Sequence, residues 1–240
     1  METKETRCKN CEALLRPEDK FCPQCGQPAK TKRLKIRQVR KDVLRKFLHA
    51  DSGILRLTFG LATQPGTVAR NYFAGKRKTY YDPLKYLTLT VGISVLLTNS
   101  FDLMSGSGGH TNPVSVFVAR HVNIIFFLSV PIAAGFSWLL FRKKGYNYAE
   151  HLALHAFLGG FRTMFYLLVF TPLIVLFREH YNTILLFYFS LWTGYVAWAN
   201  IQLMGRPAWL GIVKTLLIVL LTQVVISVGI FLGAWMYFRH

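Results

Sequence analysis

Five stretches of about 20 apolar residues constrain this sequence more than any other feature. They cover residues 84–104, 122–141, 152–177, 184–204 and 210–238. A helix rises 1.5 Å per residue, so about 20 residues cross the ~30 Å hydrocarbon layer of a bilayer. Burying five such helices in a soluble core would need more polar sequence to surround them than this chain offers. The sequence therefore predicts an all-α integral membrane protein with about five transmembrane helices, and a transmembrane bundle over 84–240.

Charge divides the chain into two unlike parts. Residues 1–85 hold 20 of the 29 Lys and Arg residues and 8 of the 11 Asp and Glu residues. A basic head before an apolar body is typical of an integral membrane protein, and nucleic-acid binding is the alternative source of such an excess. The first residues, METKETRCKN, lack the basic stub and apolar core of a signal peptide. We therefore expect the head to stay on the side of the membrane where it was made.

The remaining basic residues orient the predicted helices. With a cytoplasmic N-terminus, the inner loops hold Arg142, Lys143, Lys144, Arg206 and Lys214. The outer side then carries only Arg120, Arg178 and Arg239. This distribution follows the positive-inside rule, and five spans would place the C-terminus outside.

All four cysteines fall within the first 25 residues, as two Cys-x-x-Cys pairs. Cys8, Cys11, Cys22 and Cys25 can supply four thiolates to one tetrahedral Zn²⁺. Residues 1–30 hold too few apolar side chains for a metal-free core, so we expect metal binding and folding to be coupled. Disulfide or redox chemistry is the alternative, although the βαβ surroundings of thioredoxin-like motifs are missing. Four thiolates leave no open position for a catalytic metal, which favours one structural Zn²⁺.

Residues 31–83 are predicted to form basic amphipathic helices at the membrane interface. In the first of these, apolar residues recur every three or four positions, at Ile36, Val39, Val43, Leu44, Phe47 and Leu48. Basic residues such as Arg40 and Lys41 occupy much of the rest. Such a helix suits an anionic membrane surface, and an ordinary solvated helix packed on a neighbour is the alternative.

Further interface residues precede the first apolar stretch. Short helices are expected over 54–63 and from Gly66 or Thr67 up to Gly75, whose glycine ends the second. The residues that follow and that we expect in the headgroup layer are Lys76, Arg77, Tyr81 and Tyr86. Basic and tyrosine side chains next to a span are those that this layer selects.

Arg162 is the charged residue deepest in a predicted span. An ionisable group there costs at least ~2.5–3.5 kcal/mol on insertion scales, so it should face the bundle interior with a partner. Asp102, Glu150, Glu179 and backbone carbonyls near prolines are the candidate partners. A ligand or substrate contact is the other interpretation.

Glu150, His151 and His155 open the third apolar stretch. His151 and His155 are four residues apart and therefore share one helical face, with Glu150 beside them. Such a pair can bind a metal, as histidine clusters do in membrane-embedded oxygenases, but those enzymes need several such motifs. The alternative role for the two histidines is hydrogen bonding between helices or contact with lipid headgroups. No catalytic triad, phosphate-binding loop or carboxylate pair can be assembled, which favours a non-enzymatic protein.

A Tyr-x-x-Gly-Lys-Arg…Tyr-x-Pro motif lies before the first apolar stretch. The motif and its surroundings comprise Asp51, Gly53, Pro65, Gly66, Tyr72, Gly75, Lys76, Arg77, Tyr81, Pro83 and Tyr86, then Tyr148–Ala149–Glu150–His151 and His155. With these residues the chain resembles an uncharacterised bacterial inner-membrane family, a domain of unknown function that follows a Cys₄ zinc ribbon. The resemblance implies a multi-pass protein of the bacterial inner membrane, so that the outer C-terminus expected from five spans would be periplasmic, and it supplies no catalytic residue.

These features predict a docking or scaffold module that binds a cytosolic partner or anionic lipid through its ribbon and basic helices. One alternative is a transporter or channel subunit for an anion or lipid, using Arg162 and the His151/His155 face. Another is a lipid-modifying enzyme that uses Glu150 and the two histidines. Nucleic acid is not the expected partner. A homo-oligomer is a further expectation, because the Gly229/Gly233 pair permits close helix contact.

Overall fold

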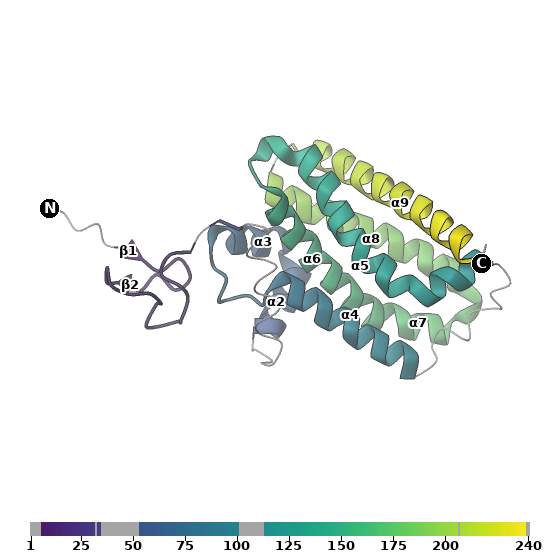
Figure 1. Ribbon diagram of the computed structural model, residues 1–240, viewed down its shortest axis with the longest axis horizontal. Coiled ribbons are helices and arrows are strands. Elements are labelled where there is room, and N and C mark those ends of the chain that lie inside the picture. Colours follow the sequence, from purple (N-terminus) through teal and green to yellow (C-terminus); the bar gives the residue numbers. More distant parts are fainter. Residues whose placement is uncertain (1–5, 32, 35–52, 101–112, 206, 239–240) are drawn as a thin grey trace.

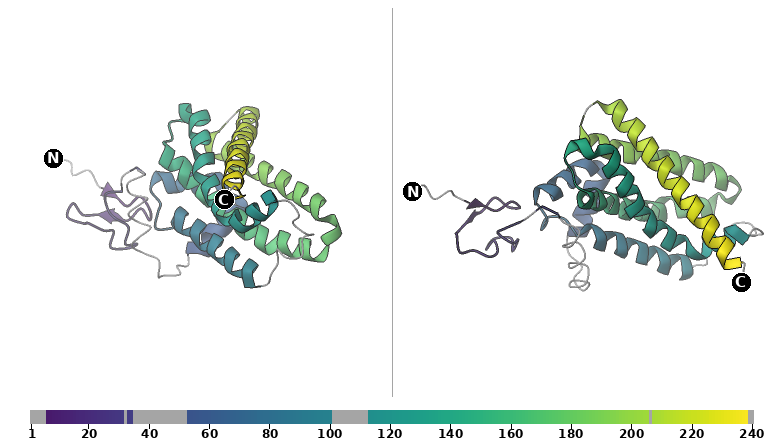
Figure 2. Two further views of the ribbon diagram at one scale, coloured as in Figure 1. Left: turned by 45° about the vertical axis from the view of Figure 1, so that its right-hand side comes forward. Right: turned by 45° about the horizontal axis from the view of Figure 1, so that its top comes forward.

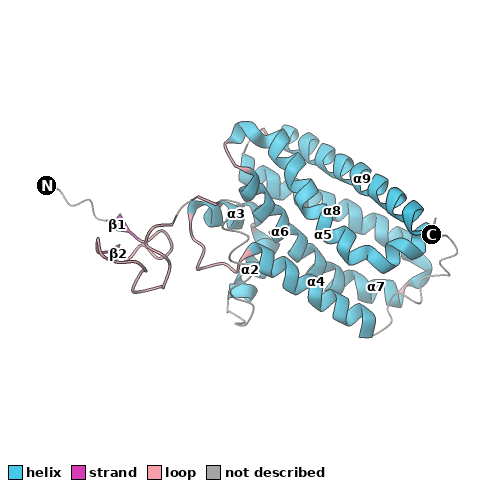
Figure 3. Cartoon of the chain, viewed as in Figure 1, coloured by secondary structure: helices cyan, strands magenta, loops and turns pink. Residues whose placement is uncertain are grey.

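The computed structural model of this chain describes residues 6–31, 33–34, 53–100, 113–205 and 207–238. Two short strands near the N-terminus, β1 (Thr6–Arg7) and β2 (Leu14–Leu15), pair antiparallel with Thr6 opposite Leu15. From Gly53 onward, the described residues form helices and the connections between them (Figure 3). The predicted basic helix with Arg40 and Lys41 lies outside the described residues.

Eight α-helices follow the strands in the described parts of the chain. They are α2 (Gly53–Thr63), α3 (Pro65–Ala74), α4 (Pro83–Ser100), α5 (Pro113–Phe141), α6 (Tyr148–Phe165), α7 (Thr171–Leu176), α8 (Tyr181–Met204) and α9 (Ala208–Phe238). The 3₁₀ turns η1 (Arg142–Lys144) and η3 (Arg178–His180) follow α5 and α7, and the π-helix η2 (Tyr166–Phe170) joins α6 to α7. Proline begins α3, α4 and α5, because its fixed φ suits a first helical residue and its missing N–H costs little there.

Four helical segments in the described parts of the chain are long and apolar enough to cross a membrane. They are Ile124–Lys144, Tyr148–Leu176, Arg178–Met204 and Ala208–Phe238. Their length and composition indicate a membrane protein, and they coincide with the second to fifth apolar stretches of the sequence. The first stretch, 84–104, begins as α4, in which Pro83–Leu97 forms a shorter apolar helix. The rest of that stretch runs past the described residues, so the fifth span stays a prediction.

The long helices pack side by side into one bundle (Figures 1 and 2). Helix α6 packs against α4 and α5, while α9 packs against α5 and α8. The two short helices α2 and α3 cover one end of the bundle, where α3 contacts α8 and α2 contacts α6. The strands lie beyond this end, and the C-terminal end of α9 lies at the opposite end (Figure 1).

We call the covered end of the bundle the head end; it comprises α2, α3, the connection 142–147 and Gly205 after α8. Hydrogen bonds place these segments together. The Asn147 side-chain amide donates to the Leu34 carbonyl over 3.1 Å, and the Gln202 side-chain oxygen accepts from the Gly66 N–H over 2.9 Å. The inner loops expected from the charge distribution therefore lie at the same end as the segment that leads from the cysteines.

Helix α3 crosses α8 with the two backbones nearly in contact. A Cβ added at Gly66 would lie 2.7 Å from both the Ala199 carbonyl oxygen and the Leu203 nitrogen, closer than real Cβ atoms approach. Glycine is therefore required for this crossing. The next glycine, Gly75, ends α3 as predicted, with a left-handed φ of 110° that caps the last carbonyls.

The membrane-length segment Tyr148–Leu176 is not a uniform α-helix. Its middle turn, η2, is a π-helix that starts four residues after Arg162. Pro172 follows in the first turn of α7 and cannot donate a hydrogen bond to a preceding carbonyl. Wide turns of this kind occur where the regular ladder is interrupted, frequently at functional sites. The apolar pattern of the sequence did not reveal this turn.

Candidate functional site

The four cysteine sulfurs gather into one cluster. All four Sγ atoms lie within 4.8 Å of one another, with Cys8 and Cys25 3.7 Å apart and Cys11 and Cys22 3.6 Å apart. Four thiolates bound tetrahedrally at ~2.3 Å from one zinc ion would lie about 3.8 Å apart. The spacing fits a closed Cys₄ zinc site and is far longer than a disulfide bond. The donor set therefore suits one structural Zn²⁺.

Two matching turns build this cluster. In each, the N–H four residues after the first cysteine bonds back to that cysteine's carbonyl, from Glu12 to Cys8 over 2.9 Å and from Gly26 to Cys22 over 2.8 Å. Glu12 and Gly26 both have positive φ, of 63° and 70°. Burial raises the pKa of the Cys8 thiol, but bonds from the backbone of Cys11 and Asn10 outweigh it and lower the pKa to about 7. Backbone donors beside Cys8 therefore favour its thiolate, which is the form that binds a metal.

Both cysteine turns hold the segment 75–79, which we call the basic loop. The Gln27 side-chain oxygen accepts from the backbone N–H groups of Arg77 and Lys78 over 3.2 and 3.3 Å. The Asn10 side-chain oxygen accepts from the Thr79 N–H over 3.1 Å and from its hydroxyl over 2.7 Å. The ribbon is therefore fastened, through residues that neighbour its cysteines, to the loop that leads into α4.

Glu150 is a second point of attachment. The Arg33 guanidinium donates to both of its carboxylate oxygens, from Nε over 2.9 Å and from Nη2 over 2.6 Å. The same carboxylate accepts from the Asn147 N–H over 2.8 Å, and the Asn147 side chain accepts from the Glu150 N–H, forming a capping box at the start of α6. The hydrogen bonds from the Arg33 guanidinium to Glu150 raise the pKa of Arg33. The segment after the cysteines is thus pinned to the bundle.

The two histidines of α6 are buried in the bundle. His151 Nδ1 lies 2.9 Å from the Ser137 hydroxyl of α5. The Nε2 atoms of both His151 and His155 are buried with no hydrogen-bond partner in the described part of the chain. No third His, Cys, Asp or Glu ligand joins them there, since the cysteine cluster is the one potential metal-binding group among the described residues. Glu150, their predicted companion, is engaged by Arg33 instead.

Arg162 has a partner that the sequence did not indicate. Its Nε donates to the Tyr188 hydroxyl over 2.7 Å. Of the acidic partners that the sequence suggested, Glu150 pairs with Arg33 and Asp102 lies outside the described residues. The prediction that Glu150 could be the partner of Arg162 is therefore wrong. A tyrosine can serve here because its ring is apolar and its hydroxyl is polar, which suits a site inside a bundle.

The predicted interface residues separate into two groups. Lys76 and Arg77 lie in the basic loop and Tyr81 follows it, all partly exposed at the head end. Tyr86 differs from the prediction, because it is 0% exposed and its hydroxyl lies 3.1 Å from that of Thr58. Its ring fills the space beside Gly160. Tyr86 is a packing residue between helices rather than a headgroup contact.

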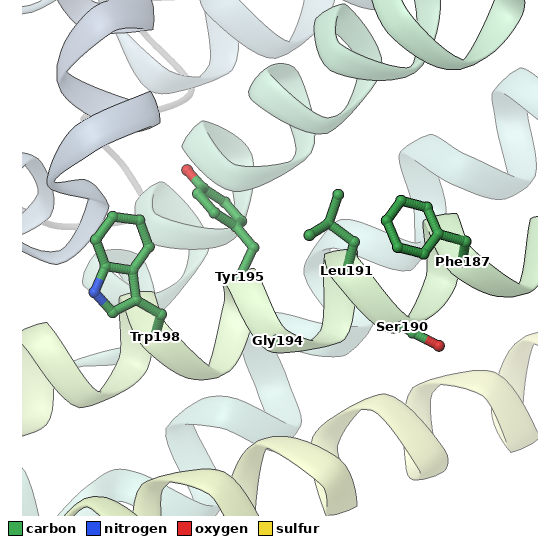
Figure 4. Close-up of a pocket in the computed structure, with 6 residues that line it drawn as sticks. All are labelled: Phe187, Ser190, Leu191, Gly194, Tyr195 and Trp198. Atoms are coloured by element: carbon green, nitrogen blue, oxygen red, sulfur yellow. The ribbon is translucent and has the colours of Figure 1, made fainter. Parts of the chain in front are cut away.

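An apolar hollow of about 580 Å³ opens on α8. It is lined by Phe187, Ser190, Leu191, Gly194, Tyr195 and Trp198, and most of these side chains lie along one side of the helix (Figure 4). Tyr195 turns its hydroxyl toward α2, where it donates to the Leu61 carbonyl over 2.8 Å. None of the polar candidates from the sequence lines this hollow, which has the character of a surface facing lipid chains.

Sequence reasoning missed the residues that join the parts of the chain. Asn10, Gln27, Arg33 and Tyr188 have no local pattern that identifies them, since their partners are 26 to 117 residues away. Asn147 did carry a signal. Asn-x-x-Glu before an apolar run is a capping-box sequence, and it would have placed the start of α6 at Tyr148.

Two known families match parts of this chain. The family described as a zinc-ribbon domain matches residues 7–29. A family described as a protein of unknown function (DUF3667) matches residues 51–95, which span α2, α3, the basic loop and most of α4. No curated protein and no solved structure matches the chain. The ribbon match and the sulfur cluster together identify a zinc ribbon with one structural Zn²⁺, set before a domain of unknown function.

Proposed function

We propose that this protein is a non-enzymatic docking module of the bacterial inner membrane, whose zinc ribbon and basic loop form a rigid cytoplasmic head that binds anionic lipid. The bundle would cross the membrane five times, with α4 as the first span and the C-terminus in the periplasm. The observation that carries the proposal is the fastening of the ribbon, through Asn10 and Gln27, to a cationic loop at the head end.

Charge at the head end supports a lipid partner. Lys78 of the basic loop is exposed, and so are Arg142, Lys143 and Lys144 of η1. Each basic side chain near an anionic membrane surface contributes about 1 kcal/mol of attraction. Because Asn10 and Gln27 accept from loop N–H groups rather than from the cations, the ribbon holds the loop and leaves room for Lys78 to meet phosphate groups. A cytosolic protein partner would use the same exposed head.

Reversal of these charges tests the proposal. The full chain is placed in nanodiscs of equal parts phosphatidylcholine and phosphatidylglycerol, then released, and retained lipids are identified by native mass spectrometry. We expect phosphatidylglycerol to be enriched several-fold in the wild type. Lys78→Glu with Lys143→Glu and Lys144→Glu should abolish the enrichment, since three attractions become repulsions.

The control is Arg178→Glu, a charge reversal in the exposed turn η3 at the opposite end of the bundle. It should leave phosphatidylglycerol enrichment as in the wild type. A wild-type protein that retains both lipids equally, or equal loss in the control, would contradict lipid binding at the head end. A head that binds a soluble protein instead would show no lipid preference at all.

A further inference from the structure

Arg162 sits inside a cage of aromatic rings contributed by two other helices. Its guanidinium carbon lies 5.3 Å from the ring centre of Phe126 on α5. On α8, the corresponding distances are 5.5 Å to Tyr188, 5.6 Å to Trp192 and 5.9 Å to Phe189. These are distances at which a ring face attracts a cation. The cage holds the charged group in place without neutralising it.

The Arg162 guanidinium has N–H donors beyond the one that bonds to Tyr188. Its Nε bonds to Tyr188, but neither Nη atom has a hydrogen bond within the described residues, and no described carboxylate forms an ion pair with it. The side chain is also only partly buried. Two free Nη groups on one plane match the geometry of a carboxylate or phosphate, which they can bind in bidentate fashion. The cage therefore presents a cation with two available donor groups to an anion.

The position of Arg162 limits where this anion comes from. It is the middle residue of the membrane-length segment Tyr148–Leu176, about 20 Å from either end at 1.5 Å per residue. A lipid headgroup at its usual depth does not reach that far. The anion must therefore enter the bundle, either as a small ion or at the end of an apolar chain.

The wide turn after Arg162 is a second, independent feature of this place. Tyr166, the first residue of η2, packs its ring against that of Tyr188, with the ring centroids 5.1 Å apart. Phe170, the last residue of η2, contacts the same ring at 4.7 Å. The π-helix thus supports the tyrosine that orients Arg162. A π-helical turn interrupts the regular α-helical hydrogen bonding, and such turns occur frequently at functional sites.

We infer that Arg162 is an intramembrane binding site for an oxyanion, a carboxylate or phosphate group, held in the cage of Phe126, Tyr188, Phe189 and Trp192. The aromatic walls favour an oxyanion carried by an apolar chain, such as a fatty acid. This site is independent of the head end, so its failure would leave lipid binding by the basic loop untouched.

The test measures thermal stabilisation of the full chain in phosphatidylcholine nanodiscs, because a ligand that binds the folded state raises the midpoint of unfolding. Oleate should raise the midpoint in a concentration-dependent way, and oleyl alcohol, with the same chain and no charge, should not. The same midpoint is also measured with acetate and with inorganic phosphate, which carry the charge without the chain. A shift with these small ions as well would identify a free oxyanion as the ligand and not a chain-borne one.

Two variants of Arg162 connect the shift to the site. Arg162→Gln should abolish the oleate shift while its own midpoint without ligand stays the same or rises, because an uncompensated charge has been removed. Arg162→Lys keeps the charge and loses the planar pair of donors, and should weaken oleate binding about tenfold. An unchanged oleate shift in both variants would overturn the inference. So would the absence of any shift in the wild type with all four ligands.

Discussion

Replacing Cys22 and Cys25 by serine is expected to unfold the ribbon and to free the basic loop, while the helical bundle stays folded. The reason is the size of the zinc contribution. Binding of structural zinc supplies about 10–16 kcal/mol to the folding of small zinc domains, whereas the ribbon core consists of little more than Leu15 and the cysteines themselves. Without the metal, the ribbon has nothing else to hold it together.

Hydrogen exchange of the full chain, followed by mass spectrometry, measures this outcome. Protection should be lost over residues 7–31 and also over 75–79, because Asn10 and Gln27 can then no longer hold the loop. Protection in α5, α6 and α9 should not change. Zinc content should fall from one ion per chain to none.

Glu18→Ser is the matched control, since it places a serine on an exposed ribbon residue that binds no metal. It should keep one zinc per chain and wild-type exchange. Retention of zinc by the double cysteine variant, or protection of 75–79 without the ribbon, would show that the ribbon does not organise the loop.

The second large effect is expected at Glu150, which is 3% exposed and carries both the ion pair to Arg33 and the cap of α6. Glu150→Gln removes the charge, yet glutamine can still serve as the third helical residue of a capping box. Glu150→Ala removes both functions. A lost cap costs about 0.5–2 kcal/mol, and a broken buried ion pair costs up to about 3–5 kcal/mol. The Arg33 side chain is 54% exposed, so the ion-pair contribution falls well below that upper figure.

We therefore expect the midpoint of thermal unfolding in nanodiscs to fall in the order wild type, Glu150→Gln, Glu150→Ala. A double-mutant cycle with Arg33→Gln isolates the ion pair, and a coupling of about 1 kcal/mol or more is expected for residues in direct contact. Glu179→Gln removes an exposed carboxylate from the other end and should have no effect. If Glu150→Ala behaves like Glu179→Gln, the attachment of the ribbon segment to α6 is wrong.

Local features of the sequence predicted the parts of this protein well. Two Cys-x-x-Cys pairs predicted the zinc site because metal ligation needs only a few residues at short spacing. Apolar length predicted four of the membrane-length helices, and Gly75 and Pro83 marked the end of α3 and the start of α4, because helix ends are determined by the chain next to them.

The contacts between parts could not be predicted in this way. Arg33 and Glu150 are separated by 117 residues, and nothing in either neighbourhood selects the other among the available charges. A tyrosine before a span is typical of the interface, but the small Gly160 opposite Tyr86 makes room for a buried ring. For Arg162, opposite charge is the usual rule and predicts an acidic partner. Its cage consists of rings on α5 and α8, and it depends on how the helices pack.

The ribbon and the basic residues of the head end are expected to face the cytoplasm, so a membrane-impermeant amine reagent should label the lysines of the head end from that side alone. In inverted inner-membrane vesicles, Lys78, Lys143 and Lys144 should be modified. In spheroplasts, which expose the opposite face, they should remain unmodified. A lysine introduced as Arg178→Lys in η3 should show the reverse pattern, which confirms that the reagent reaches the outer side. Modification of Lys143 and Lys144 in intact spheroplasts would contradict the orientation, and with it the docking of the head on the cytoplasmic leaflet.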